Sequence, residues 1–95
     1  MAVQNVTVAI PAATWTQLTP ADATAIRVQN LGSSNLWLMS TIAAGPAPSV
    51  QTGAIFLKPG ERNTITLSTE FVGITLATRL WAYSDTATNA AVSNA

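Results

Sequence analysis

The 95-residue chain carries a charge on only 8% of its residues, four of each sign, where ordinary soluble domains carry about 25%. Its exterior must therefore consist of uncharged polar groups or be covered by another protein. A net charge of zero favours association with other protein molecules. Cys and His are absent, which excludes disulfides and removes the commonest metal ligand and the commonest general base.

Strands are predicted along the chain because apolar and polar residues alternate at a period of two. Val, Ile and Thr are abundant, and these β-branched residues suit a pleated surface. The alternation runs through residues 2–10, 25–30, 36–41, 64–68 and 79–84, with a short last strand expected near 90–93. The residues expected to face inward between two sheets are Ile26, Val28, Leu36, Leu38, Ile65, Leu67 and Leu80.

Turn-forming residues separate these strands at regular intervals. Pro11 ends the first strand, and residues 31–35 are predicted to form a hairpin loop between the strands on either side. Residues 45–48 (GPAP) form a longer loop that proline stiffens. The strongest turn signal is residues 58–61 (KPGE), where Pro followed by Gly suits a type II turn, whose third residue, Gly60, needs a positive φ.

About eight short strands, with turns roughly every 8–12 residues, predict an all-β fold: a single-domain antiparallel β-sandwich or small barrel over residues 1–95. No window approaches the roughly 20 consecutive apolar residues that a membrane helix needs, so no membrane partner is expected. The four scattered cations form no basic stripe, so no nucleic-acid partner is expected either.

The sequence contains no recognisable catalytic or metal-binding constellation. A glycosidase-like carboxylate pair would need Glu61 with Glu70 or Asp85, but Glu61 and Asp85 stand at solvated turns. Ser and Thr are plentiful, yet no His exists to activate them as nucleophiles. The scattered carboxylates form neither a zinc site nor a calcium loop, and no glycine-rich phosphate loop is present. We therefore predict that the protein is not an enzyme and binds no metal or cofactor.

Two tryptophans fall on the strand face opposite the expected core. Trp37 stands between Leu36 and Leu38, and Trp81 follows Leu80. One interpretation is that a bulge reverses the local register and makes each Trp a core residue. The other is that one or both anchor an interface, where Trp is enriched, or serve as a platform for stacking carbohydrate. On the second interpretation Trp37 and Trp81 are candidate interface residues.

The first strand lacks the charged residues that usually protect a sheet edge. Residues 1–11 carry no charge, and the first charged residue is Asp22. Unprotected edge strands invite pairing with another chain. Residues 1–11 are therefore a candidate interacting strand or arm, with Val3, Val6 and Val8 as candidate interface residues. The alternative is an ordinary strand inside its own sheet.

Three stretches of the chain resemble a known family. They are residues 25–38 (AIRVQNLGSSNLWL), 53–61 (GAIFLKPGE) and 78–84 (TRLWAYS). Together they resemble the small β-sandwich, jelly-roll-like cement or decoration proteins on the capsids of tailed bacteriophages. The resemblance covers roughly residues 25–84 and rests on a strand–Asn-x-Gly–strand layout followed by Leu-x-Pro-Gly-Glu.

The resemblance implies a jelly-roll-like sandwich with a non-enzymatic role in the virion. Proteins of this family bind the outside of an assembled shell and resist its internal pressure, commonly as dimers or trimers. The implied partners are the major capsid protein and further copies of the chain, and the implied location is the capsid surface after synthesis in the host cytoplasm. A head-fibre, tail or spike component is the first alternative. A carbohydrate-binding module that uses an exposed Trp37 or Trp81 is the second.

Overall fold

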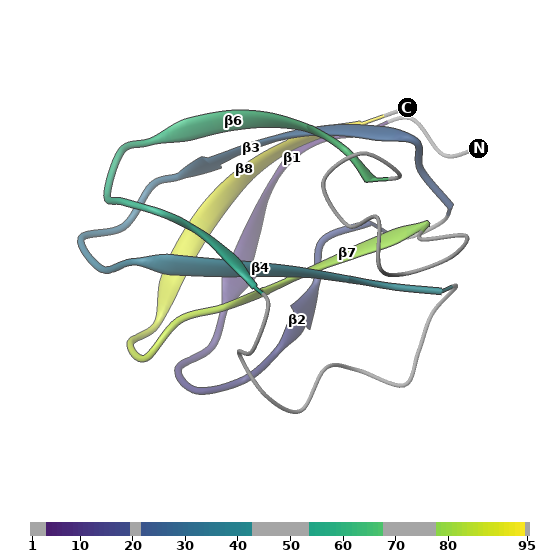
Figure 1. The fold of residues 1–95 in the computed structure, drawn as a ribbon. Helices are drawn as coiled ribbons and strands as arrows, with labels where there is room; N and C mark the ends of the chain where they lie inside the picture. Colours follow the sequence, from purple (N-terminus) through teal and green to yellow (C-terminus); the bar gives the residue numbers. More distant parts are fainter. Residues whose placement is uncertain (1–3, 20–21, 43–53, 68–77, 95) are drawn as a thin grey trace.

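The computed structural model describes residues 4–19, 22–42, 54–67 and 78–94 (Figure 1). Within these ranges the chain forms eight strands: β1 (Gln4–Ile10), β2 (Thr16–Gln17), β3 (Ala25–Asn30), β4 (Leu36–Thr41), β5 (Ile55–Leu57), β6 (Arg62–Thr66), β7 (Arg79–Tyr83) and β8 (Thr88–Asn94). The parts of the sequence prediction that lie outside the described residues are Val3, Glu70 and the loop 45–48.

The strands form two antiparallel four-stranded sheets that pack face to face (Figure 1). The first sheet has the order β1-β8-β3-β6, and the second has the order β2-β7-β4-β5. The pairs β1·β8, β2·β7, β3·β6 and β4·β5 are those that a single long hairpin would contain. Folding that hairpin over itself adds β3·β8 and β4·β7, and the result is an eight-stranded jelly roll. The predicted all-β, jelly-roll-like sandwich is confirmed.

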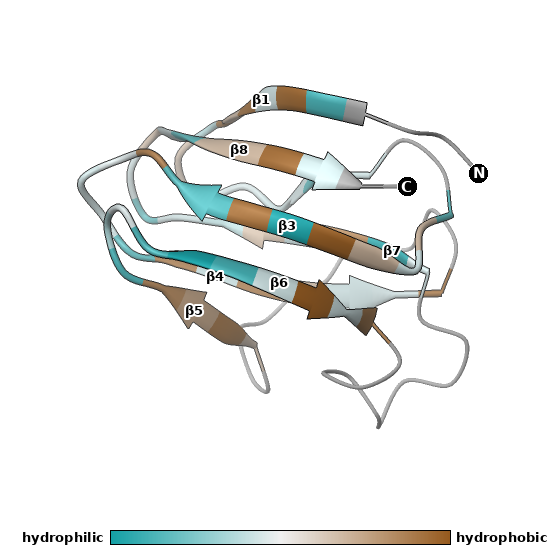
Figure 2. Cartoon of the chain, turned by 90° about the horizontal axis from the view of Figure 1, so that it is seen from above, coloured by the Kyte–Doolittle hydropathy of each residue, from teal (hydrophilic) through white to brown (hydrophobic). Residues whose placement is uncertain are grey.

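The core fills the space between the sheets with the apolar residues that the alternation assigns to the inner faces. Every residue predicted to face inward is at most 1% exposed. Figure 2 shows the alternation as bands of opposite hydropathy along β3. Burial of apolar surface contributes about 25 cal/mol per Å², so these side chains supply most of the stabilisation. The further buried apolar residues are Ile10, Leu18, Ala23, Leu57, Ala82, Ala90 and Val92.

The connection between β3 and β4 corrects the sequence prediction. Residues 31–35 were expected to form a hairpin loop, but β3 pairs with β6 and β8 while β4 pairs with β5 and β7. The loop therefore carries the chain from one sheet to the other. The buried Asn30 side chain holds it there, because its Nδ2 donates to the carbonyls of Ser34 at 2.6 Å and Leu57 at 3.1 Å. Its Oδ1 accepts from the Gly32 N–H at 3.0 Å.

The turn between β5 and β6 has the predicted chemistry. Gly60 has a φ of +79°, and the Glu61 N–H donates to the Lys58 carbonyl at 2.9 Å. The Glu61 carboxylate in turn accepts from the Lys58 N–H at 2.9 Å. The turn also crosses between the sheets, and it is fixed to the end of β3 because the Asn30 N–H donates to the Glu61 carbonyl at 3.0 Å.

Candidate interaction surface

The outer face of the second sheet carries the large side chains that the core does not contain. Burial alternates along β4 and β7, so that the outward residues are half-buried and the inward residues are buried. The pairing of β4 with β7 runs without a break from Trp37↔Tyr83 to Thr41↔Arg79. The outward residues of this sheet are Gln17, Trp37, Met39, Thr41, Phe56, Arg79, Trp81 and Tyr83.

Trp37 and Trp81 therefore lie outside the core, as the simple alternation indicates. The interpretation in which a bulge turns them inward is wrong, because the strand register is continuous through both residues. The inner positions are filled by Leu38 and Leu80, each 0% exposed, which leaves no core position for either indole. Their use as interface residues stays a prediction.

Four aromatic rings form a row across this face, which we call the aromatic row: Phe56, Trp37, Tyr83 and Trp15. The ring centroids of Trp37 and Phe56 are 5.3 Å apart with a 48° angle between the planes. Those of Trp15 and Tyr83 are also 5.3 Å apart, at 42°. Trp37 and Tyr83 are direct neighbours across β4 and β7. Phe56 is 47% exposed at the β5 end of the row.

A second line of residues runs beside the aromatic row. Met39 pairs with Trp81 across β4 and β7, and Trp81 pairs with Gln17 across β7 and β2. The Trp81 Nε1–H donates to Thr41 Oγ1 at 2.8 Å, which fixes the orientation of the indole. The hydrogen bond satisfies the polar end of the ring and leaves its apolar surface available for contact.

Among the residues of the four strands in this sheet, Arg79 alone has a charged side chain, and it forms an ion pair at the border of the face. Arg79 Nε lies 3.0 Å from Asp22 Oδ1, and the side chains are 15% and 65% exposed. Such a partly exposed pair contributes little stability, but it neutralises the cation next to the apolar rows. The strand residues of this face therefore present aromatic and thioether groups beside one neutralised cation, with Lys58 and Asp85 exposed in the adjoining turns.

Three of the four rings in the aromatic row were not among the predicted interface residues. Trp37 was predicted to be an interface residue and the alternation put Tyr83 on the same face as Trp81, but Trp15 and Phe56 were not placed. The signal was present for two of the three, because Phe56 precedes the buried Leu57 and Tyr83 follows the buried Ala82. Their neighbours across the sheet could not be known without the strand pairing, which brings Phe56 and Tyr83 to either side of one residue.

The candidate residues on the first strand occupy a sheet edge. β1 pairs with β8 along its whole length and forms one edge of the first sheet. The strand thus belongs to its own sheet and is also an edge. Burial falls along the strand: Ile10 is 1% exposed, Val8 is partly buried against the core, and Val6 is 43% exposed. A contact of Val6 or Val8 with another chain stays a prediction.

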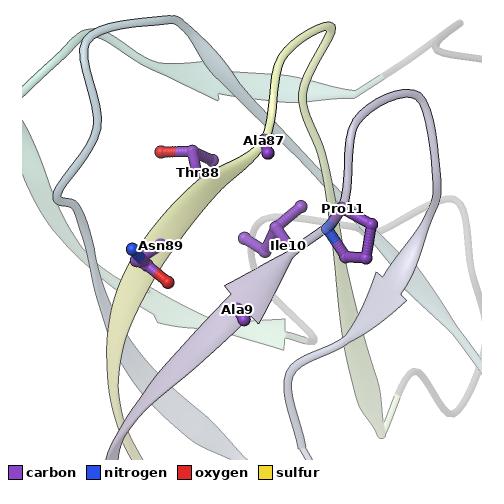
Figure 3. Close-up of a pocket in the computed structure, with 6 residues that line it drawn as sticks. All are labelled: Ala9, Ile10, Pro11, Ala87, Thr88 and Asn89. Carbon is purple, nitrogen blue, oxygen red and sulfur yellow. The ribbon is translucent and has the colours of Figure 1, made fainter.

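A shallow hollow of about 280 Å³ lies where β1 ends and β8 begins (Figure 3). No charged side chain lines it. Thr88 Oγ1 is buried without a hydrogen-bond partner, but it packs against Gly32, where an added Cβ would lie only 1.7 Å from it. Figure 3 shows this hydroxyl pointing away from Ile10 and Pro11. The lining residues are Ala9, Ile10, Pro11, Ala87, Thr88 and Asn89.

Ionisable groups are not gathered into a site anywhere in the described ranges. Those ranges contain no group of three or more acidic side chains placed to hold a metal ion. Asp22 is paired with Arg79, Glu61 closes its own turn, and Asp85 is exposed at the β7–β8 turn. The described segments also contain no helix long and apolar enough to cross a membrane.

Comparison of the chain with protein-family models, with curated proteins and with solved structures found no match.

Proposed function

We propose that the protein is a non-enzymatic structural protein of a virion: a decoration or cement protein that binds the outer surface of a tailed-phage capsid. The observation that carries the proposal is the aromatic face of the second sheet on a chain with almost no charge. The jelly-roll strand order supports it, because this architecture recurs in virion proteins. On this proposal the partners are the major capsid protein and further copies of the chain.

The chemistry of the face suits a large protein partner. Trp, Tyr, Phe and Met are enriched in the centres of protein interfaces, where charged residues are depleted. Fixed aromatic rings lose little conformational entropy on binding, since stacking already limits their rotamers. Each Å² of apolar contact contributes about 25 cal/mol, and a shell repeats that contact at many equivalent positions. Surface burial alone can then stabilise the shell without any chemical step.

The proposal is tested by co-sedimentation with capsids assembled from the major capsid protein of the phage that encodes this chain. We expect the wild-type protein to pellet with intact shells, and the Trp37→Ala and Phe56→Ala variants to bind at least about tenfold more weakly, as for central interface residues. Leu31→Ala is the matched control, because Leu31 is an equally exposed apolar residue, at 50%, outside the aromatic row. Equal binding of all variants, or no binding by the wild type, would contradict the proposal.

A carbohydrate-binding module is the second candidate, and the aromatic row favours it. Sugar rings stack on exposed aromatic faces, and lectins also use the jelly-roll architecture. Phe56 and Trp37 lie at the exposed end of the row, with the Gln17 amide on the same face. Retention of the protein by an insoluble polysaccharide, with loss of retention in Trp37→Ala and no pelleting with shells, would replace the capsid proposal with this one.

A further inference from the structure

The two sheets have four edges, and three of them are protected against pairing with another chain. β2 contains two residues, and β5 contains three before it reaches Lys58 and Pro59. β6 begins at the cationic Arg62. Short strands, charges and proline are the usual devices that blunt an edge. β1 has none of them, because it is seven residues long and contains neither charge nor proline.

The hydrogen-bonding direction of β1 follows from the alternation of bonds across the first sheet. The Leu31 N–H donates to the Asn89 carbonyl at 3.0 Å, so Asn89 directs its backbone groups toward β3. Its neighbours Thr88 and Ala90 must then direct theirs toward β1, where they pair with Ile10 and Val8. The remaining residues of β1 point their N–H and C=O groups outward, away from β8.

Those outward-pointing residues are Asn5, Thr7 and Ala9, and all three are exposed. They present three N–H donors and three C=O acceptors along one continuous edge. No described segment lies beyond this edge, as Figure 2 shows at the β1 side of the sheet. The groups that match them are those of another extended strand.

We propose that β1 pairs antiparallel with β1 of a second copy of this chain, about a twofold axis at Thr7. The pairing joins two four-stranded sheets into one continuous sheet of eight strands. It sets Thr7 opposite the partner's Thr7 and Asn5 opposite the partner's Ala9, so all six outward backbone groups of each copy find partners. A twofold contact of this kind is closed and therefore limits the assembly to a dimer.

The side chains agree with this register on both faces. On the inner face, Val6 lies beside the partner's Val8, so the exposed end of each β1 is covered by the half-buried part of the other. On the outer face, Thr pairs with Thr, which is favourable across strands. Like charges cannot oppose each other because the strand has none.

Neighbouring registers leave backbone groups without partners. Moving the axis to Val8 sets Asn5 opposite the partner's Pro11, which has no N–H to donate. Moving it to Val6 sets Ala9 opposite residue 3, before the strand begins. The axis at Thr7 uses the whole described strand.

The pairing involves the first sheet alone. It therefore does not depend on what the aromatic face of the second sheet binds.

Cysteine cross-linking tests the register directly, because the chain has no cysteine of its own. In Thr7→Cys the two Cα atoms would lie about 5.5 Å apart, as in a hydrogen-bonded antiparallel pair, within the range of a disulfide. In Asn5→Cys each new cysteine would stand opposite the partner's Ala9. The two cysteine Cα atoms would then be displaced from each other by four residues along the strand direction, about 13 Å. We expect oxidation to give a covalent dimer of Thr7→Cys and little of Asn5→Cys. Equal cross-linking of both, or of neither, overturns the proposed pairing.

Sedimentation equilibrium tests the dimer itself. We expect a wild-type mass of twice the 9.9 kDa of one chain, and a single-chain mass for Thr7→Lys, which sets two cations opposite each other at the axis. Thr64→Lys is the matched control on the far edge of the same outer face, and it should remain dimeric. A monomeric wild type at high concentration, or a Thr7→Lys variant as dimeric as the wild type, overturns the proposal. If Thr7→Lys fails to fold, the cross-linking of the two cysteine variants tests the pairing instead, because cysteine places only a small side chain at the edge.

Discussion

At the scale of single residues, the most informative side chain is Asn30, a polar group that is 0% exposed at the end of β3. A buried amide is costly unless its groups are hydrogen-bonded, and Asn30 bonds to three backbone groups in two segments. Its own backbone also bonds to the turn before β6. This residue therefore ties the crossing from β3 to β4 to the crossing from β5 to β6.

We predict that Asn30→Ala lowers the free energy of unfolding by about 2–3 kcal/mol, since it leaves the Ser34 and Leu57 carbonyls and the Gly32 N–H without their partner. Asn35→Ala, in the same loop but exposed, should change it by less than about 0.5 kcal/mol. Urea denaturation of both variants measures the difference. Equal stabilities would mean that the amide network does not hold the loop.

At the scale of elements, the period-two alternation separates core residues from outward-facing residues on the same strand. On β4, Leu38 faces the core and is 0% exposed. On β5, Ile55 pairs with Leu38, and the next residue, Phe56, points outward. The inner face of the sheet thus supplies stability, whereas the outer face leaves large apolar side chains partly exposed.

We predict that Leu38→Ala lowers the free energy of unfolding by about 2–5 kcal/mol through the cavity it creates, and that Phe56→Ala lowers it by about 1 kcal/mol or less because its ring is already half in solvent. Chemical denaturation of the pair measures both. If Leu38→Ala lowered the free energy of unfolding only slightly and Phe56→Ala lowered it strongly, the inner and outer faces of β4 and β5 would be assigned the wrong way round.

We also predict that Val8→Pro lowers the free energy of unfolding by about 1–3 kcal/mol more than Thr7→Pro does. This difference is the cost of leaving buried backbone groups unpaired. Proline removes an N–H: the Val8 N–H points toward β8 of its own chain, whereas the Thr7 N–H points away from β8 and can bond only to a second chain, so its loss leaves the fold of a single chain intact. Thermal unfolding of the two variants measures this. The opposite order would reverse the assignment of outward-pointing groups on β1.

The sequence predicted the strands and the core well, because each strand has one buried face and a one-residue slip would expose all of its apolar residues. It did not predict which strands pair. The segment 31–35 has the residues of a tight hairpin loop, but loop composition does not say which sheet the next strand enters. The aromatic row was missed for the same reason, since Phe56, Trp37 and Tyr83 become neighbours only through the pairing of β5, β4 and β7.

At the scale of the whole molecule, the sandwich has two chemically different outer faces. The second sheet presents the aromatic row and Met39. The first sheet presents small polar side chains with two exposed cations, Arg27 and Arg62, and no acidic residue. A partner bound through apolar contact and one bound through charge would therefore meet opposite sides of the molecule.

We predict that binding to shells changes by less than about threefold between low and high salt, because salt screens charges and not apolar contacts. Co-sedimentation across a salt series measures this. A steep loss of binding at high salt, accompanied by a loss in Arg27→Ala or Arg62→Ala, would indicate that the first sheet carries the contact.

The central claim, that the second sheet meets the capsid, is tested most directly by a cryo-electron microscopy reconstruction of decorated shells. The account predicts that Trp37 and Phe56 lie within the contact with the shell and that the outer face of the first sheet lies toward solvent. A map in which Arg27 and Arg62 touch the shell while the aromatic row faces solvent would contradict it.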